Sequence, residues 1–129
     1  MKSTLAPTPG AIVRVWFPES ESVMQPGPKF RPVLVLAVCC ESNEGPRALV
    51  AYGTSQRTDR YSRGEVVVPR SLVPSLLECD TKFCLTKAIW LPLTGEYFSS
   101  NGRQPAPTPF PLERLPNLRQ ALEESGLKL

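Results

Sequence analysis

The sequence of 129 residues predicts one mainly β domain, a small and partly open barrel of five to six short strands followed by a C-terminal helix. Residues 33–38 form an unbroken apolar run, which is typical of a strand buried on both faces at the centre of a sheet. Fifteen prolines disfavour long helices, and clusters of turn-forming residues separate the other β-rich segments. This pattern favours such a barrel over a parallel α/β sheet.

The barrel is expected over residues 10–98, after a flexible arm at residues 1–9. Arg14 interrupts the first strand segment, and we expect its side chain to point outward. Pro32 cannot donate a hydrogen bond to a sheet ladder, so it should be the first residue of the second strand, with Arg31 already in extended geometry. The segments rich in β-branched, aromatic and other apolar residues are the predicted strands: 11–17, 32–38, 47–53, 65–69 and 81–93, with a short edge at 97–98.

The C-terminal part is expected to hold an extended connector and then a helix. Within the connector, residues 99–115, prolines stand at every second position from 105 to 111, which predicts a rigid extended spacer. Leu115, Leu118 and Leu122 form an apolar stripe, and Gly126 can end the helix that we expect over residues 116–127.

The composition excludes several kinds of chemistry. The formal net charge of +3 permits an anionic partner without requiring one. Because the chain has no histidine, the commonest general base is unavailable, as is any serine–histidine or cysteine–histidine pair. The four cysteines lack a standard zinc spacing and are expected to be reduced structural thiols, so no metal and no cofactor is predicted: Cys39, Cys40, Cys79 and Cys84.

The N-terminal sequence predicts no signal peptide, because prolines at positions 7 and 9 interrupt the place of its apolar core. The longest apolar run, residues 33–40, is far too short to cross a bilayer as a helix. We therefore expect a cytoplasmic protein with no membrane partner.

A turn centred on residues 42–43 predicts how the second and third strands pair. If these strands form an antiparallel hairpin, the turn places Val33 opposite Tyr52 and Leu36 opposite Leu49. A β-bulge would shift this register by one residue.

The same register sets Arg31 across from Thr54 at the open end of the hairpin. An arginine and a hydroxyl that converge there can bind a phosphate, because the guanidinium offers a planar fork of donors with a fixed charge. Such groups also stabilise charge that develops on phosphoryl oxygens in a transition state. The alternative interpretation is a strand-end arginine that reaches for water or for a neighbouring carboxylate.

The neighbouring loops supply further candidates for binding a single-stranded nucleic acid. Glu19 and Glu21, in the loop after the first strand, are candidate general bases or else ordinary solvated carboxylates. Basic, polar and aromatic side chains that suit contacts to a phosphate backbone and to one base are the candidate substrate-binding residues: Lys29, Ser55, Gln56, Arg57, Arg60 and Tyr61.

Three segments resemble the MazF/PemK family of toxins from toxin–antitoxin modules: Gly10–Phe17, Lys29–Leu36 and Val50–Gln56. The Arg-Pro-Val-Leu-Val block and the Thr-Ser-Gln after the next strand carry most of this likeness. The resemblance implies an SH3-like barrel of the MazF/CcdB type, usually a homodimer. It also implies a metal-independent endoribonuclease, in which the 2′-hydroxyl of single-stranded RNA attacks its own phosphate and leaves a cyclic phosphate.

The resemblance also implies roles for individual residues and a partner. Arg31 would stabilise the phosphorane and protonate the leaving oxygen, while Thr54 would hydrogen-bond the same phosphate. A small antitoxin with an acidic, initially disordered segment would cover the basic groove and silence the enzyme.

Two alternatives stay open at this point. A catalytically inactive barrel that binds protein or nucleic acid is favoured by the missing histidine and by the lack of a placed general base. A gyrase poison, which shares the barrel, would rely on a C-terminal tryptophan, whereas this chain ends in Gly126-Leu127-Lys128-Leu129.

Overall fold

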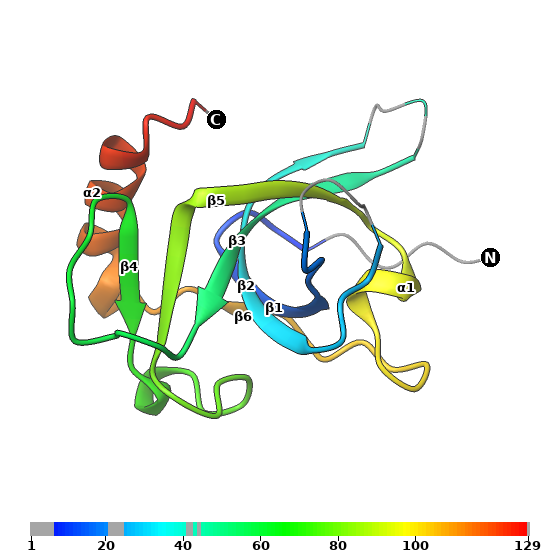
Figure 1. The fold of residues 1–129 in the computed structure, drawn as a ribbon, viewed down its shortest axis with the longest axis horizontal. Helices are drawn as coiled ribbons and strands as arrows, with labels where there is room; N and C mark the ends of the chain where they lie inside the picture. Colours follow the sequence, from blue (N-terminus) through cyan, green and yellow to red (C-terminus); the bar gives the residue numbers. More distant parts are fainter. Residues whose placement is uncertain (1–6, 21–24, 41–42, 44, 129) are drawn as a thin grey trace.

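One curled antiparallel sheet forms the centre of the computed structural model, which describes residues 7–20, 25–40, 43 and 45–128 (Figure 1). The neighbours in the sheet follow the order β4-β5-β3-β2-β1-β6, so β2 and β3 are its central strands. The sheet curls into a half-barrel, and a helix follows it at the C-terminus. The predicted mainly β fold with a partly open barrel is therefore confirmed. The strands are β1 (Ala11–Trp16), β2 (Phe30–Cys39), β3 (Arg47–Thr54), β4 (Glu65–Val68), β5 (Thr81–Pro92) and β6 (Thr108–Pro109).

Four short helical elements complete the described chain. They are the 3-10 turns η1 (Arg70–Leu72) and η2 (Leu112–Arg114), the single-turn helix α1 (Gly95–Phe98), and the helix α2 (Leu115–Ser125). Figure 1 shows α2 beside β4 on one side of the molecule and α1 on the other side. Of the predicted N-terminal arm, residues 1–6 lie outside the described residues.

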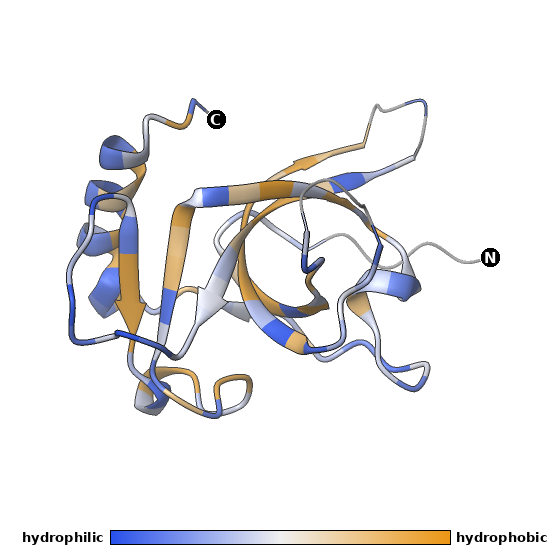
Figure 2. Ribbon diagram, in the orientation of Figure 1, coloured by the Kyte–Doolittle hydropathy of each residue, from blue (hydrophilic) through white to orange (hydrophobic). Residues whose placement is uncertain are grey.

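The strand β2 is buried on both faces, as its apolar run predicts. Val33, Leu34 and Val35 are fully enclosed and Leu36 is 7% exposed. Alternate residues point to opposite faces of a strand, so β2 contributes to two separate cores. Figure 2 shows the apolar residues concentrated along the strands, while the loop after β3 and much of α2 are hydrophilic.

The two cores divide the molecule between its two helices. One core gathers Val33 and Val35 with Val13, Val15, Ala48, Val50, Leu91 and Leu93, and it is closed by Tyr97 and Phe98 of α1. The other core joins Leu34 and Leu36 to the β4–β5 hairpin and to α2, through Ile12, Leu49, Ala51, Val66, Val68, Val73, Leu76, Leu77, Phe83, Leu85, Phe110, Leu118 and Ala121.

The β2–β3 hairpin keeps the predicted register at its open end and departs from it near the turn. Val33 pairs with Tyr52 as predicted. A bulge between Val35 and Ala37 shifts the remaining pairs by one residue, so Leu49 lies opposite Ala37 and not opposite Leu36. The prediction for Leu36 was wrong because a bulge cannot be read from the turn position alone.

Pro32 lies inside β2 and not at its start, which corrects the prediction. Pro32 and the two residues before it pair with β1. Arg14 faces Pro32, and Trp16 faces Phe30. The ladder to β3 begins at Val33, directly after the proline that cannot donate to it. Gly53 packs against this point so closely that a Cβ there would lie 2.4 Å from the carbonyl oxygen of Pro32.

The proline-rich connector is part of the sheet and not a free spacer. Within it, β6 pairs with β1, Thr108 facing Ile12 and Pro109 facing Ala11. Phe110 then enters the core beside α2. The predicted edge at 97–98 is also wrong, since both residues lie in α1 and are buried in the other core.

The C-terminal helix α2 begins one residue before its predicted start and ends at Ser125. Gly126 follows in the left-handed conformation, with φ of 72°, which suits a glycine that ends a helix. Leu118 is buried, and Leu115 and Leu122 pack partly buried against the same core. The apolar stripe predicted from the leucine spacing therefore covers the sheet.

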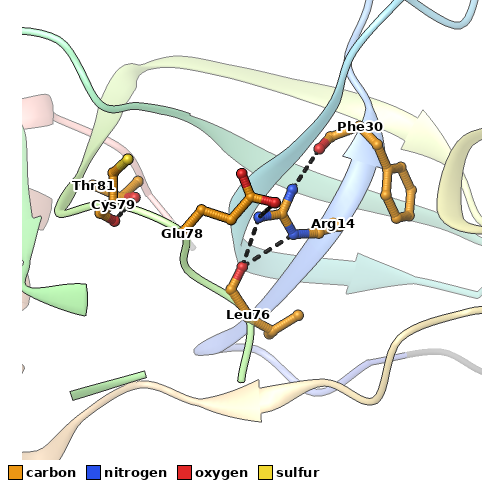
Figure 3. Close-up of polar contacts among 6 residues, drawn as sticks. All are labelled: Arg14, Phe30, Leu76, Glu78, Cys79 and Thr81. Carbon is orange, nitrogen blue, oxygen red and sulfur yellow. Dashed lines mark hydrogen bonds and ion pairs between the residues drawn. The ribbon is translucent and has the colours of Figure 1, made fainter. Parts of the chain in front are cut away.

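Arg14 does not point outward as predicted, because its guanidinium bonds the backbone of two other segments (Figure 3). Its Nε and Nη2 donate to the carbonyl of Leu76 at 3.0 and 2.8 Å, and its Nη1 donates to the carbonyl of Phe30 at 2.7 Å. The Glu78 carboxylate lies 3.8 Å away but is 87% exposed. A planar fork of donors can serve several carbonyls at once, so Arg14 ties the segment after η1 to the start of β2.

We predict that Arg14→Met lowers the free energy of unfolding by about 2–4 kcal/mol, because two carbonyls lose charged donors and methionine fills only part of the space. Urea denaturation measures the change. Glu78→Gln is the matched control and should change stability by less than about 0.5 kcal/mol, since an exposed ion pair contributes little. Equal losses for the two variants would contradict the role given to the carbonyl bonds.

Candidate functional site

A cleft of about 440 Å³ opens where β1 ends, β2 begins and β5 bends. The pairing of β1 with β2 brings the segment after Trp16 next to the segment before Phe30. The β2–β3 register then adds Tyr52, which faces Val33. The lining residues are Phe17, Pro18, Glu19, Ser20, Pro28, Lys29, Arg31, Tyr52, Lys87 and Ile89.

The cleft is strongly cationic. Lys29, Arg31 and Lys87 line it with one carboxylate, Glu19. Neither of the two ion pairs found among the described residues involves any of these four side chains. Like charges gathered in a concave surface focus a positive potential, which attracts an anionic ligand.

Aromatic contacts fix the position of Arg31. Its guanidinium carbon lies 5.3 Å from the centre of the Tyr52 ring. The Phe17 ring meets the same tyrosine edge-on, with centres 5.1 Å apart and planes inclined at 61°. A cation over an aromatic face is attracted to it, so the charge of Arg31 is held at the cleft wall before any ligand arrives.

Thr54 ends β3 two residues after Tyr52 and is not among the residues that line the cleft. The ladder between β2 and β3 begins at the pair of Val33 and Tyr52, and the predicted opposition of Arg31 and Thr54 lies beyond it: Arg31 pairs with Val15 of β1, and Thr54 pairs with Lys82 of β5. The Thr54 hydroxyl accepts the backbone N–H of Gln56 at 3.1 Å. Because a hydroxyl also donates, its proton remains able to reach an acceptor.

Only some of the predicted loop residues line a cavity: Lys29 and Glu19 line the cleft, and Arg60 and Tyr61 line a second, smaller cavity. Ser55, Gln56 and Arg57 are exposed on the loop after β3. Arg60 and Tyr61 line a cavity of about 220 Å³ between that loop and α2. Of the two candidate bases, Glu19 lines the first cleft and Glu21 lies outside the described residues.

Tyr61 is fastened to α2 through its hydroxyl, although its ring is 66% exposed. The hydroxyl donates to the Glu124 carboxylate and accepts from the Gln120 amide. The other Glu124 oxygen accepts the Gly64 N–H at 2.9 Å. The tyrosine bond and the backbone bond lower the pKa of Glu124, and the same carboxylate raises the pKa of Tyr61.

Sequence reasoning missed Lys87, Tyr52 and Phe17 as members of the site. Tyr52 could have been found, because the register that placed it opposite Val33 also sets it on the face of Arg31. Lys87 could not, because the partner of β3 jumps from Ala88 to Cys84 at an irregularity in β5. Figure 1 shows the sharp bend of β5 that accompanies this jump.

A buried polar cluster lies on β4 and β5 beside Tyr52, which pairs with Cys84. Lys82 and Glu65 form an ion pair at 3.1 Å, with side chains 8% and 16% exposed. The Cys84 thiol donates to the second Glu65 oxygen at 3.4 Å. Burial, and then the negative charge of Glu65, raise the pKa of Cys84 to about 11, so this thiol is neutral at physiological pH.

All four cysteines are free thiols, Cys40 and Cys79 being exposed. Within the described part of the chain, no group of three or more histidine, cysteine or acidic side chains is placed to hold a metal ion. Among the described helices, none has the length and apolar character needed to cross a bilayer. The chain matches no protein-family model and no curated protein.

We predict that the free energy of unfolding contains a Cys84 contribution that is lost at alkaline pH. Below about pH 9 the thiol is neutral in the folded and unfolded chain, whereas from there to about pH 11 only the unfolded chain ionises. The loss should reach roughly 1 kcal/mol at pH 10. Urea denaturation of wild type and of Cys84→Ala at pH 8 and pH 10 isolates the Cys84 contribution to the free energy of unfolding. An equal change of this free energy with pH in both proteins would contradict the prediction.

Proposed function

We propose that this chain is a metal-independent endoribonuclease that cleaves single-stranded RNA by attack of the 2′-hydroxyl on the adjacent phosphate. The observation that carries the proposal is the cleft itself, where Arg31 is stacked on Tyr52 beside Lys29, Lys87 and Glu19. Fixed cations suit a phosphodiester, and a carboxylate among them suits proton removal.

In the proposed reaction, Glu19 takes the proton of the 2′-hydroxyl while the 2′-oxygen forms a bond to phosphorus. The bond from phosphorus to the 5′-oxygen breaks, and a cyclic phosphate is left on the upstream nucleotide. Arg31 stabilises the negative charge on the phosphorane oxygens and donates the proton that the leaving oxygen needs. Lys29 and Lys87 bind phosphate oxygens, and Thr54 adds a hydrogen bond from the next strand.

The wider biological role in this proposal is the toxin of a type II toxin–antitoxin module. The three segments that resemble MazF/PemK toxins include the ends of β1 and β2 that line the cleft. A small antitoxin with an acidic segment would neutralise the same cations that bind RNA. We further propose that the toxin acts in the cytoplasm as a homodimer.

A non-catalytic module that binds nucleic acid or protein is the second candidate. It is favoured by the position of Thr54, which does not line the cleft and whose hydroxyl accepts the Gln56 N–H. The nuclease and a nucleic-acid-binding module both predict that RNA binds to the cationic cleft, and only the nuclease predicts that the RNA is cut. A protein-binding module predicts neither. Binding of RNA and cleavage of RNA are therefore measured in separate experiments.

We predict that Arg31→Ala lowers the cleavage of a single-stranded RNA oligonucleotide by a factor of about 10²–10³, because the phosphorane loses its fixed donor. The assay is run in excess chelator with a substrate fluorescent on cutting. Arg31→Lys keeps the charge but not the planar fork, so it should restore only part of the rate. Expression of wild type alone should arrest growth and Arg31→Ala should not. A wild type that leaves RNA intact and cells unharmed would favour the binding module.

We predict that Glu19→Gln slows cleavage by a factor of about 10² but does not weaken RNA binding, because it removes a base and a negative charge from a cationic cleft. Binding is measured by fluorescence anisotropy with an oligonucleotide whose 2′-hydroxyls are replaced by hydrogen, which cannot be cut. Weaker binding together with slower cleavage would make Glu19 a positioning residue instead of the base.

A further inference from the structure

Lys82 is a buried cation with two partners, and only one of them is its ion pair. It is 6% exposed on β5. Its Nζ lies 3.1 Å from a Glu65 oxygen on β4 and donates to the backbone carbonyl of Arg57 at 3.2 Å. The second bond leaves the sheet and reaches the loop after β3.

The Arg57 carbonyl is the point at which that loop is held. It accepts the Lys82 ammonium and also the backbone N–H of Arg60 at 3.2 Å. Arg57 itself has φ of 56°, a left-handed conformation that is unfavourable for a residue with a side chain. Contacts from outside the loop are needed to hold such a backbone, and Lys82 supplies one.

Lys82 lines the smaller cavity with Arg60 and Tyr61, and across the sheet it lies beside the end of β3. Its direct partner across the β3–β5 ladder is Thr54, the last residue of β3. The Thr54 hydroxyl holds the Gln56 N–H, so the loop is fastened at its first turn by Thr54 and at its second by Lys82. The exposed arginines of the loop, Arg57 and Arg60, are thereby fixed relative to the end of β3, two residues after the Tyr52 that lines the cleft.

We propose that Lys82 is a positioning residue that holds the loop of residues 55–60 in the conformation that binds the RNA backbone beyond the scissile phosphate. This inference rests on the proposed function. Glu65 neutralises the buried ammonium, and Lys82 acts on RNA only through the Arg57 carbonyl. In this proposal Arg57 and Arg60 add to the cations of the cleft when a longer strand is bound, so the preferred substrate is a single strand of several nucleotides and not a dinucleotide.

A contribution to stability does not by itself explain why Lys82 and Glu65 form a buried ion pair. A buried ion pair can often be replaced by uncharged residues of similar size without loss of stability. Lys82→Met with Glu65→Gln keeps the net charge and most of the volume, yet it removes the donor to Arg57. Glu65→Gln alone keeps that donor but leaves the buried ammonium without its counter-charge, which lowers the free energy of unfolding. It serves as the control under conditions in which urea denaturation shows that it is fully folded.

Limited digestion with trypsin tests the anchoring without any assumption about function. The bonds after Arg57 and Arg60 should be cut about tenfold faster in the double variant than in wild type, since one charge-assisted hydrogen bond restrains the loop. In Glu65→Gln they should be cut at nearly the wild-type rate. The bond after Arg103, on an exposed turn elsewhere, is the internal control and should be cut equally in all three proteins.

Binding and cleavage of RNA test the positioning role. The double variant should bind the uncleavable oligonucleotide about tenfold more weakly and raise KM for the cleavable one, with kcat unchanged. Cleavage of a dinucleotide, which contacts the cleft alone, should stay at the wild-type rate. Glu65→Gln, where it is fully folded, should bind and cleave both substrates as wild type does.

The outcomes separate this inference from the proposed function. If wild type binds RNA but does not cut it, the nuclease function is excluded. A loss of RNA binding in the double variant would still support the positioning role of Lys82. If the double variant binds the oligonucleotide as wild type does, or if trypsin cuts the loop at the wild-type rate, the positioning role is overturned. Equal losses on the dinucleotide and on the longer strand would also overturn it, because they indicate general damage to the fold.

Discussion

The two-sided burial of β2 is the constraint on which the rest of the structure depends. A strand enclosed on both faces must have a core on each side, and the chain provides one core closed by α1 and another closed by α2. The neighbouring strands β1 and β3 contribute to both cores, and segments from the C-terminal half of the chain, including α1 and α2, complete them. The candidate cleft lies at the N-terminal end of β2, where Lys29 and Arg31 precede the apolar run.

The cleft follows from the way the central strands meet. Pro32 gives no donor to β3, and Gly53 removes the side chain that would separate the two backbones. β2 and β3 therefore approach closely just before their ends, and the residues beyond this point, Arg31 and Thr54, are left at the rim. A proline and a glycine facing each other thus place two polar groups at the edge of an apolar core. The stacking of Arg31 on Tyr52 follows, because both side chains leave the sheet on the same face.

Local patterns in the sequence were enough to predict the first five strands, the terminal helix and the pairing of Val33 with Tyr52. They failed where distant segments decide the structure. Arg14 looks like an outward-facing charge in its own strand, but it serves the carbonyl of Leu76, 62 residues away. The proline-rich connector has the sequence of a spacer, but in the structure its strand β6 pairs with β1. Bulges in β2 and β5 have no marker in the sequence, and they set the partner of Leu49 and the position of Lys87.

The same reasoning explains why the polar cluster of Lys82, Cys84 and Glu65 could be predicted only in part. Alternation along β5 sets Lys82 and Cys84 on one face and Phe83 and Leu85 on the other, and this much can be read from the sequence. Which residues they meet depends on the β4–β5 register, which is set by a segment with an irregular 3-10 turn and not by a tight hairpin. Glu65 becomes the partner of Lys82 only through that register. A charge next to an apolar run in a sequence therefore marks the edge of a core, while its partner is fixed by the three-dimensional fold.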